Sequence, residues 1–154
     1  MTVSDTVTQT LSRGLDTALD RSVALGYTAL GHGVRRRLPT WPADPPPGAL
    51  WGRDVLVTGA SSGLGARTAV DLARLGAHVH LVVREPARCA EVIAELGAAG
   101  AGDRHTVWRC DVADPGSIRA FVAAFLASGR LVHGLVHNAG VLPATRQEDG
   151  RGHE

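Results

Sequence analysis

Three glycines at the start of an amphipathic segment carry the clearest chemical signal in the sequence. Gly59, Gly63 and Gly65 follow the short apolar run 55–57 and lead into a helical pattern that continues to about Leu75. Glycines so placed let the chain turn sharply, let the backbone approach a ligand, and let a helix pack close to a strand. The free N–H groups and the positive end of the helix dipole would then face an anion. The pattern therefore predicts a phosphate-binding turn between a strand and a helix.

A second apolar run, 77–83, completes a βαβ unit of about 30 residues around this turn. In this context the turn favours a dinucleotide ligand, and a glycine turn with a purely structural role is the alternative. A P-loop needs a lysine after its last glycine to reach the β- and γ-phosphates, and none follows Gly65. Nucleoside triphosphate chemistry is therefore not expected.

The turn and two later stretches resemble the short-chain dehydrogenase/reductase family. The family's cofactor turn, Thr-Gly-x-x-x-Gly-x-Gly, is matched in full from Thr58 to Gly65. Asp111 and Val112 follow the third expected strand, and the run 138–140 (Asn-Ala-Gly) follows the fourth. Within the family the chain looks most like the retinol-dehydrogenase-type reductases, in which the second strand ends in an apolar run followed by arginine, as here at Arg84. The resemblance covers about residues 51–140.

The resemblance implies a cofactor-binding role for each of these stretches. The turn, including Leu64, would hold the pyrophosphate and the nearby ribose, and Ser61 and Ser62 would either donate to phosphate or ribose or cap the helix. Asp111 would accept from the adenine amino group, with Val112 beside it; a polar strand terminus in a turn is the alternative. The run that would close the site around the nicotinamide-side ribose is Asn138, Ala139 and Gly140, preceded by His137 where the family usually has a second asparagine.

Arg84 bears on which cofactor binds. A carboxylate at the end of the second strand binds the adenosine ribose hydroxyls of NAD, whereas a cation there accepts the 2′-phosphate of NADP. A guanidinium matches phosphate geometry with two parallel hydrogen bonds. We therefore expect NADP(H), and NAD(H) stays open because Glu85 is adjacent. The same arginine argues against S-adenosylmethionine, whose ribose would also need an acid.

The catalytic groups of the family have no counterpart in this sequence. The resemblance implies hydride transfer between the cofactor and a small carbonyl or alcohol substrate, with a tyrosine as acid/base, a lysine four residues later that lowers its pKa, and a serine that polarises the substrate oxygen. The sequence has no lysine, and its single tyrosine, Tyr27, precedes the cofactor turn. We assign no catalytic residue and expect a truncated cofactor-binding portion without turnover of its own. A non-catalytic dinucleotide-binding module and a non-functional fragment are the alternatives.

Composition excludes several other classes of function. A length of 154 residues with 44% hydrophobic residues suits one substantial core, and a net charge of +1 gives no reason to expect nucleic acid or an acidic partner. Cys89 and Cys110 lack metal-ligand spacing, which favours reduced thiols in a cytoplasmic protein. His78 and His80 share one face of a strand, as do His133 and His137, but no acidic or cysteine partner stands at a matching spacing, so we expect no metal site.

The chain separates into four expected segments: a helical extension (1–38), a proline-rich linker (39–50), the nucleotide-binding domain (51–143) and a polar tail (144–154). Residues 1–8 are expected to lie outside the helix, whose apolar period runs from Gln9 to about Leu38. Charged residues interrupt this segment, so it suits neither a secretory signal nor a membrane span. For the run 35–37 (Arg-Arg-Arg) we favour a solvated helix end over a membrane-surface or nucleic-acid patch. An amphipathic helix resting on a membrane surface or on the rest of the subunit is a further alternative.

Strands alternate with helices from residue 54 onward, which predicts an α/β fold. Strands are expected at 55–57, 77–83, 105–110 and 131–137, with helices to about 75, over 87–99, and from a cap at Asp114. Right-handed crossovers place the strands in the order three, two, one, four. The expected architecture is a Rossmann-type, doubly wound parallel sheet, incomplete at about four strands, whose substrate and oligomeric state the sequence does not specify.

Overall fold

The computed structural model describes residues 3–22 and 28–141 of the chain. It divides the chain into two compact units, 1–44 and 45–154, and each is described by itself. The segment bounds drawn from the sequence stay a prediction. Tyr27 and the tail 144–154 lie outside the described residues.

The first unit contains helices α1 (Val3–Arg21) and α3 (Ala29–Arg35). The expected start at Gln9 is wrong, because Val3 and Val7 already continue the four-residue apolar spacing of the helix. The expected single helix is also wrong. Thr28 has an extended backbone and begins a new helix, its side chain accepting a hydrogen bond from the Gly31 N–H at 3.3 Å.

Ion pairs hold two arginines of the basic run 35–37, Arg35 and Arg36, within this first unit. Arg35 pairs with Asp16 at 3.4 Å and with Asp20 at 2.5 Å, both on α1, and its side chain is only 19% exposed. Arg36 pairs with Asp44 at 2.6 Å. Arg35 is therefore not the solvated helix end that the sequence suggested. Among the described residues, no helix is both long enough and apolar enough to cross a membrane.

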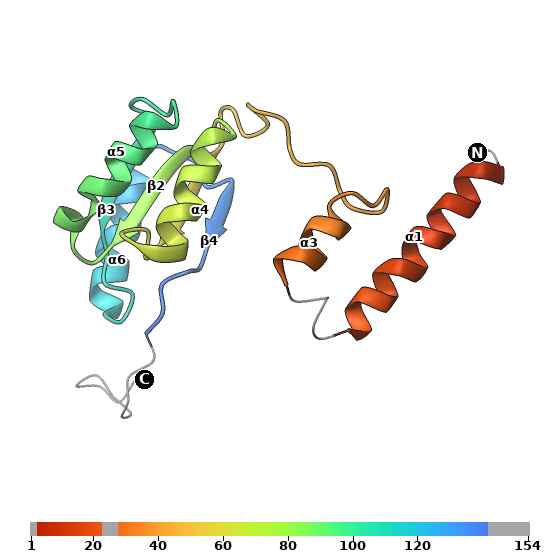
Figure 1. Cartoon of the computed structure of the whole chain (residues 1–154). Helices are drawn as coiled ribbons and strands as arrows, with labels where there is room; N and C mark the ends of the chain where they lie inside the picture. The colour runs from red at the N-terminus through yellow and green to blue at the C-terminus, as the bar shows by residue number, and fades with distance from the viewer. Residues whose placement is uncertain (1–2, 23–27, 142–154) are drawn as a thin grey trace. The chain divides into compact units, whose positions relative to one another are not determined.

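The second unit is a four-stranded parallel sheet, as predicted (Figure 1). Its strands are β1 (Asp54–Thr58), β2 (His78–Val83), β3 (His105–Arg109) and β4 (Gly134–Val136), in the order β3-β2-β1-β4. The predicted strand order is confirmed, and with it the incomplete doubly wound fold. The carboxyl ends of all the strands consequently meet at one edge of the sheet.

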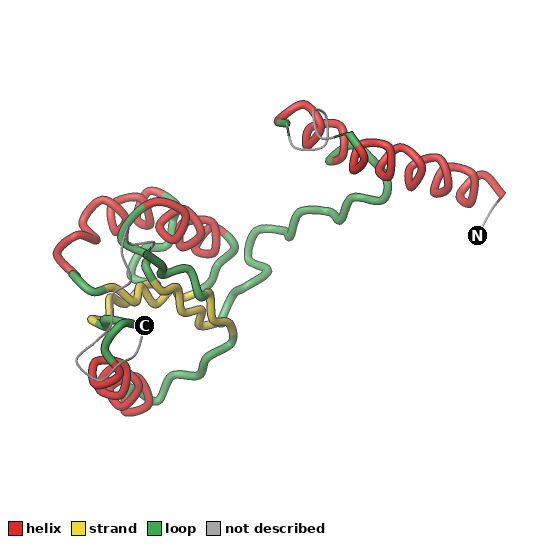
Figure 2. The backbone as a smooth tube through the Cα atoms, turned by 90° about the horizontal axis from the view of Figure 1, so that it is seen from below, coloured by secondary structure: helices red, strands yellow, loops and turns green. Residues whose placement is uncertain are grey.

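Helices cover both faces of this sheet. They are α4 (Gly63–Arg74), the 3₁₀ turn η1 (Pro86–Cys89) that continues into α5 (Ala90–Ala98), and α6 (Pro115–Ala127). Figure 2 shows α4 and α5 on one face of the sheet and α6 on the other. The larger core packs the first face around Val57, Leu81 and Leu96, and a smaller one packs Leu56 and Val82 against Phe125 of α6.

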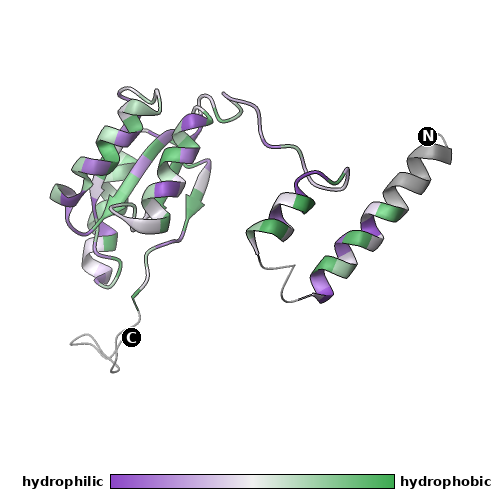
Figure 3. Cartoon of the chain, viewed as in Figure 1, coloured by the Kyte–Doolittle hydropathy of each residue, from purple (hydrophilic) through white to green (hydrophobic). Residues whose placement is uncertain are grey.

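Two helix starts agree with the sequence, and the bounds of β4 differ from it. Pro86 stands at the first position of η1, and Asp114 caps α6 by accepting from the Gly116 N–H at 2.8 Å. β4 is shorter than expected because only 134–136 pair with β1, and Leu131 and Val132 are exposed. Figure 3 shows the apolar character of β4, which among the described strands pairs with β1 alone.

Candidate functional site

A cavity of about 370 Å³ lies at the carboxyl ends of the strands, where the glycine turn meets the end of β4. Each stretch that the sequence assigned to a ligand contributes to its wall. The predicted residues that line it are Gly59, Ser61, Ser62, Arg84, Asp111, Val112, Asn138, Ala139 and Gly140. Residues 79 positions apart, such as Gly59 and Asn138, thus meet in one place because parallel strands end at the same edge.

Three predicted residues of the turn, Gly63, Leu64 and Gly65, do not line this cavity. Gly65 packs the turn from behind: a Cβ there would lie 2.5 Å from the Gly59 carbonyl oxygen and would also collide with the Asn138 side chain. Gly63 has open space around it but a φ of +58°, which favours glycine. The side chain of Leu64 is 81% exposed. These residues shape the turn rather than the cavity wall.

The end of β1 is tied to the end of β4 by the hydroxyl of Thr58. This group accepts from the backbone N–H groups of Asn138 at 3.1 Å and Ala139 at 3.0 Å, and donates to the Val136 carbonyl at 3.3 Å. In return the Asn138 amide donates to the carbonyls of Thr58 at 3.1 Å and Gly59 at 3.3 Å. Sequence reasoning used Thr58 only as a motif position and missed this role.

The two serines of the turn both line the cavity. Ser62 occupies the N-cap position of α4 with extended backbone, but its side chain makes no capping hydrogen bond. The capping alternative is therefore not realised by Ser62. Its hydroxyl can donate to an anion in the cavity, close to the N-terminus of a helix of 12 residues.

Asp111 forms hydrogen bonds within the turn that follows β3. Such a turn was the alternative to its predicted role of binding adenine. Its carboxylate accepts from the Ala113 N–H at 3.0 Å, and its own N–H donates to the Ser117 hydroxyl at 2.9 Å. The residue also lines the cavity, so the turn holds it at the wall. Its contact with adenine stays a prediction.

One end of the cavity carries charge. Arg84 lines it, with Glu85 beside it and the two side chains 3.7 Å apart, and Arg88 of η1 lines the same wall. Sequence reasoning missed Arg88, although its place three residues after Glu85 puts it one 3₁₀ turn away. It also missed the remaining lining residues, which are Val82, Val83, Cys110, Ala113 and Val141.

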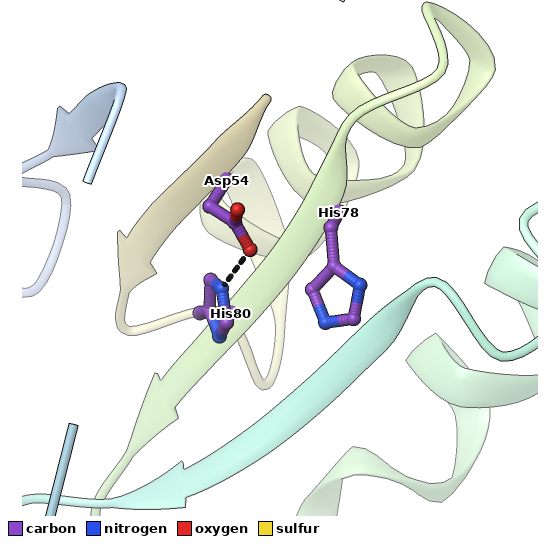
Figure 4. Close-up of side chains that lie close together, drawn as sticks. All are labelled: Asp54, His78 and His80. Atoms are coloured by element: carbon purple, nitrogen blue, oxygen red, sulfur yellow. Dashed lines mark hydrogen bonds and ion pairs between the residues drawn. The ribbon is translucent and has the colours of Figure 1, made fainter. Parts of the chain in front are cut away.

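A second polar cluster lies at the opposite, amino-terminal edge of the sheet. Figure 4 shows Asp54 and His80 joined by a hydrogen bond, with His78 beside them. The ligand atoms of these residues lie within 4.8 Å of one another. The statement that the histidines lack an acidic partner is therefore wrong. Asp54 is the register partner of His78 across β1 and β2, and that pairing is invisible to spacing along the chain.

The hydrogen bonds of His80 argue against a metal at this cluster. The Trp108 Nε1–H donates to Nδ1 of His80 at 2.9 Å, and an indole can only donate. Nδ1 is thus the acceptor, so Nε2 carries the proton and donates to the Asp54 carboxylate at 2.9 Å. A metal at Nε2 would need the lone pair that this proton occupies. Burial lowers the pKa of His80, and burial with the nearby Arg130 charge lowers the pKa of His78 to about 4, so both imidazoles are neutral at pH 7.

Comparison with known proteins identifies the family of this chain. A family model described as short chain dehydrogenase matches residues 53–152. The chain belongs to the short-chain dehydrogenase family. The parallel sheet with helices on both faces is the fold of this family, as the resemblance implied. The cofactor-binding roles of the turn and of the cavity residues stay predictions.

Curated short-chain dehydrogenases match the same region. Retinol dehydrogenase 12 of Bos taurus is 38% identical over 103 residues, which are 66% of this chain and 33% of the relative. Retinol dehydrogenase 14 of Mus musculus is 41% identical over 116 residues, 68% of this chain and 35% of the relative. The chain therefore spans about a third of the length of the curated relatives it matches.

Solved structures of the family have the same fold. A citronellol catabolism dehydrogenase of Pseudomonas aeruginosa superposes with a TM-score of 0.58 at 35% identity, covering 68% of this chain and 43% of that one. A metagenomic short-chain oxidoreductase in complex with NADP has a TM-score of 0.54 at 41% identity, covering 60% of this chain and 41% of that one.

Proposed function

We propose that the cavity binds NADP(H) and that the chain is the cofactor-binding portion of an oxidoreductase that transfers a hydride between NADP(H) and a carbonyl or alcohol. The observation that carries the proposal is the convergence of the glycine turn, Arg84, Asp111 and Asn138 on one cavity at the strand ends. A site of this kind, at the point where the strand order reverses, is where open α/β sheets bind nucleotides.

The chemistry of the cavity suits the pyrophosphate of a dinucleotide. Gly59 and Gly65 let the turn pack directly against the end of β4, because a Cβ at Gly59 would collide with Ala139 and one at Gly65 with Asn138. Ser62 lines the cavity with a hydroxyl that makes no capping bond, at the N-terminal end of α4, where free N–H groups and the helix dipole favour an anion. The pyrophosphate would bind at this turn.

The preference for NADP over NAD rests on Arg84. Its side chain is 65% exposed at the cavity, where a guanidinium can pair with a 2′-phosphate. A similar solved structure is in complex with NADP, which supports the same choice. Glu85 is the residue that would favour NAD.

For the substrate, the relatives suggest a small alcohol or carbonyl compound. Several are named retinol dehydrogenases, and one is a polyprenol dehydrogenase of Mus musculus, 39% identical over 116 residues. Since no lysine is present and no tyrosine follows the cofactor turn, we assign no catalytic residue and propose that this chain alone does not turn over substrate. A dinucleotide-binding module without catalysis is the second candidate. It would bind the cofactor equally well and would show no turnover even when supplied with a catalytic half.

We further propose a cytoplasmic location, which the two buried free thiols, Cys89 and Cys110, support. Contact of the N-terminal helices with a membrane surface is the alternative.

The test is a titration of the purified chain with NADPH and, separately, NADH, followed by tryptophan quenching and energy transfer to the nicotinamide. We expect saturable binding with NADPH preferred, and loss of that preference in Arg84→Ala. Arg119→Ala is the matched control, because Arg119 is an exposed arginine of α6 that lines neither described cavity. Failure to bind either cofactor by a folded chain would contradict the proposal.

A further inference from the structure

We propose that Asp54, Arg130 and His133 form a clamp that positions β4, and through β4 one wall of the cavity. The affinity for the cofactor then depends on residues that do not touch it. The inference rests on the proposed binding of NADP(H). The clamp lies at the amino-terminal end of β1, none of its three residues lines the cavity, and the cavity lies at the other end of the strand. Arg130 and His133 are therefore positioning residues and not ligands.

Three hydrogen bonds join the residues of the clamp. Arg130 Nη1 donates to Oδ1 of Asp54 at 2.8 Å. The Asp54 backbone N–H donates to Nδ1 of His133 at 3.0 Å, and the His133 N–H donates to the Asp54 carbonyl at 2.9 Å. The last two bonds close a ring between the first residue of β1 and the residue directly before β4. The start of β4 is thus tied to β1 by side chains as well as by backbone.

The Asp54 carboxylate is a rigid and ionised anchor for this tie. Its side chain is only 15% exposed, and the fully buried His80 donates to it at 2.9 Å (Figure 4). Burial acts to raise the pKa of Asp54, but the hydrogen bonds from His80 and Arg130 outweigh burial and the pKa lies below its ordinary value. The negative charge that holds Arg130 is therefore present at pH 7.

Little else holds the start of β4 in place. Only residues 134–136 pair with β1, and among the described strands no other strand pairs with β4. The side chain of Leu135 is half exposed, and those of Leu131 and Val132 before the strand are exposed as well. Apolar burial contributes little stability to such a segment, and short segments of this kind open locally. The polar bonds of the clamp therefore decide where the start of β4 lies.

The position of β4 reaches the cavity over a short stretch of chain. Asn138 follows His133 by five positions and lines the cavity. The N–H groups of Asn138 and Ala139 are bonded to the hydroxyl of Thr58, the last residue of β1. The two ends of β1 thus hold the two ends of β4, by Asp54 and by Thr58. When the first attachment is lost, the wall at Asn138 loses order, and a cofactor must order it again on binding, which lowers the affinity.

The test removes both side-chain ties and keeps the buried bond between His80 and Asp54. The full chain and the variant Arg130→Ala/His133→Ala are titrated calorimetrically with NADPH and, separately, NADH, at a temperature at which both proteins are folded. We expect the double variant to bind both cofactors about five- to tenfold more weakly, because both contact the same wall. Arg130→Lys keeps the charge and should stay within about twofold of the wild type. Arg119→Ala is the matched control and should change neither affinity.

Hydrogen exchange separates positioning of β4 from a general loss of stability. In the double variant the amides of 131–141 should exchange about tenfold faster, while those of β2 and β3 change by less than about twofold. Because coupling is reciprocal, NADPH bound to the wild type should slow exchange of the His133 amide at the far end of β4. Val92→Ala is the converse control: it opens a space in the core at α5 and should lower stability without weakening NADPH binding.

The outcomes distinguish the inference from the proposed function. Equal affinity of the wild type and the folded double variant would overturn the inference and spare the proposed function. Faster exchange in all strands alike would also overturn it, because the clamp would then stabilise the fold as a whole. A folded wild-type chain that binds neither cofactor would overturn both proposals. If circular dichroism shows that the double variant is unfolded, Arg130→Ala alone replaces it, with an expected loss of affinity of about threefold.

Discussion

Trp108 and His80 are joined by a 2.9 Å hydrogen bond that runs from the indole nitrogen on β3 to Nδ1 on β2. It is the first link of a network that continues from His80 Nε2 to the Asp54 carboxylate, which also pairs with Arg130 at 2.8 Å. The network connects three strands and the segment before β4. It lies at the edge of the sheet opposite the cavity, which makes it a structural element rather than part of the nucleotide site.

Replacing Trp108 with phenylalanine should destabilise the fold. The change keeps an aromatic ring beside Phe121 and Phe125 but leaves Nδ1 of the fully buried His80 without its donor. An unsatisfied buried acceptor costs about 1–3 kcal/mol, measurable by urea unfolding. The control is Trp51→Phe, since Trp51 is 69% exposed and contacts Arg104 through its ring face. Equal stability of the two variants would contradict the assigned proton positions.

Stability should fall as the pH drops from about 6.5 toward 4. The pKa of His78 is about 4 in the folded chain and has its ordinary value of 6.5 in the unfolded chain. Between these two pH values the unfolded chain binds a proton at His78 that the folded chain does not, so the free energy of unfolding falls as the pH drops. Burial lowers the pKa of His80 as well, which adds to the effect in the same direction. The stabilisation is complete above the ordinary histidine pKa. With screening at the partly exposed His78, its share is about 2 kcal/mol.

The measurement is the urea midpoint as a function of pH for the wild type and for His78→Gln. The variant should show a shallower loss between pH 6.5 and 4. Identical slopes would show that His78 is not the group responsible.

Thr58→Val should loosen the junction between the glycine turn and the end of β4. Valine has nearly the same shape but cannot accept from the N–H groups of Asn138 and Ala139, which lie in a half-buried and an exposed residue beside the buried Thr58. We expect a loss of about 1 kcal/mol, with weaker cofactor binding, whereas Thr58→Ser keeps the hydroxyl and should lose much less. Thermal unfolding and an NADPH titration measure the two effects. A serine variant as impaired as the valine variant would point to packing instead of hydrogen bonding.

Two glycines of the turn should respond differently to alanine. In Gly65→Ala the new methyl group would meet the Gly59 carbonyl and the Asn138 amide, so helix α4 must move; we expect a loss of about 3 kcal/mol and of NADPH binding. In Gly63→Ala the methyl group has open space, and only the positive φ of +58° is unfavourable, at about 1 kcal/mol. Chemical unfolding of the two variants side by side gives the comparison. A larger loss for Gly63→Ala would refute the close packing at Gly65.

The order of strands and helices followed from the sequence because its signals are local. Apolar runs such as 77–83, separated by helical periods, predict a parallel sheet, and right-handed crossovers then leave few possible strand orders. The glycine spacing similarly predicted which edge of the sheet carries the cavity. Boundaries were less well predicted: β4 is short because pairing with β1, and not apolar character, decides where a strand ends.

Contacts across the sheet were decided by tertiary structure alone. The sequence by itself determined the α/β fold, the glycine turn and the arginine at the end of β2, since each depends on residues that are close together along the chain. Asp54 meets His78 through the register of two strands, and Thr58 meets Asn138 across 80 positions. Arg88 joins Arg84 at the cavity because a 3₁₀ turn, anchored by buried Cys89, brings it there. The spacing of residues along the chain does not predict such contacts, because they depend on how whole helices and strands pack.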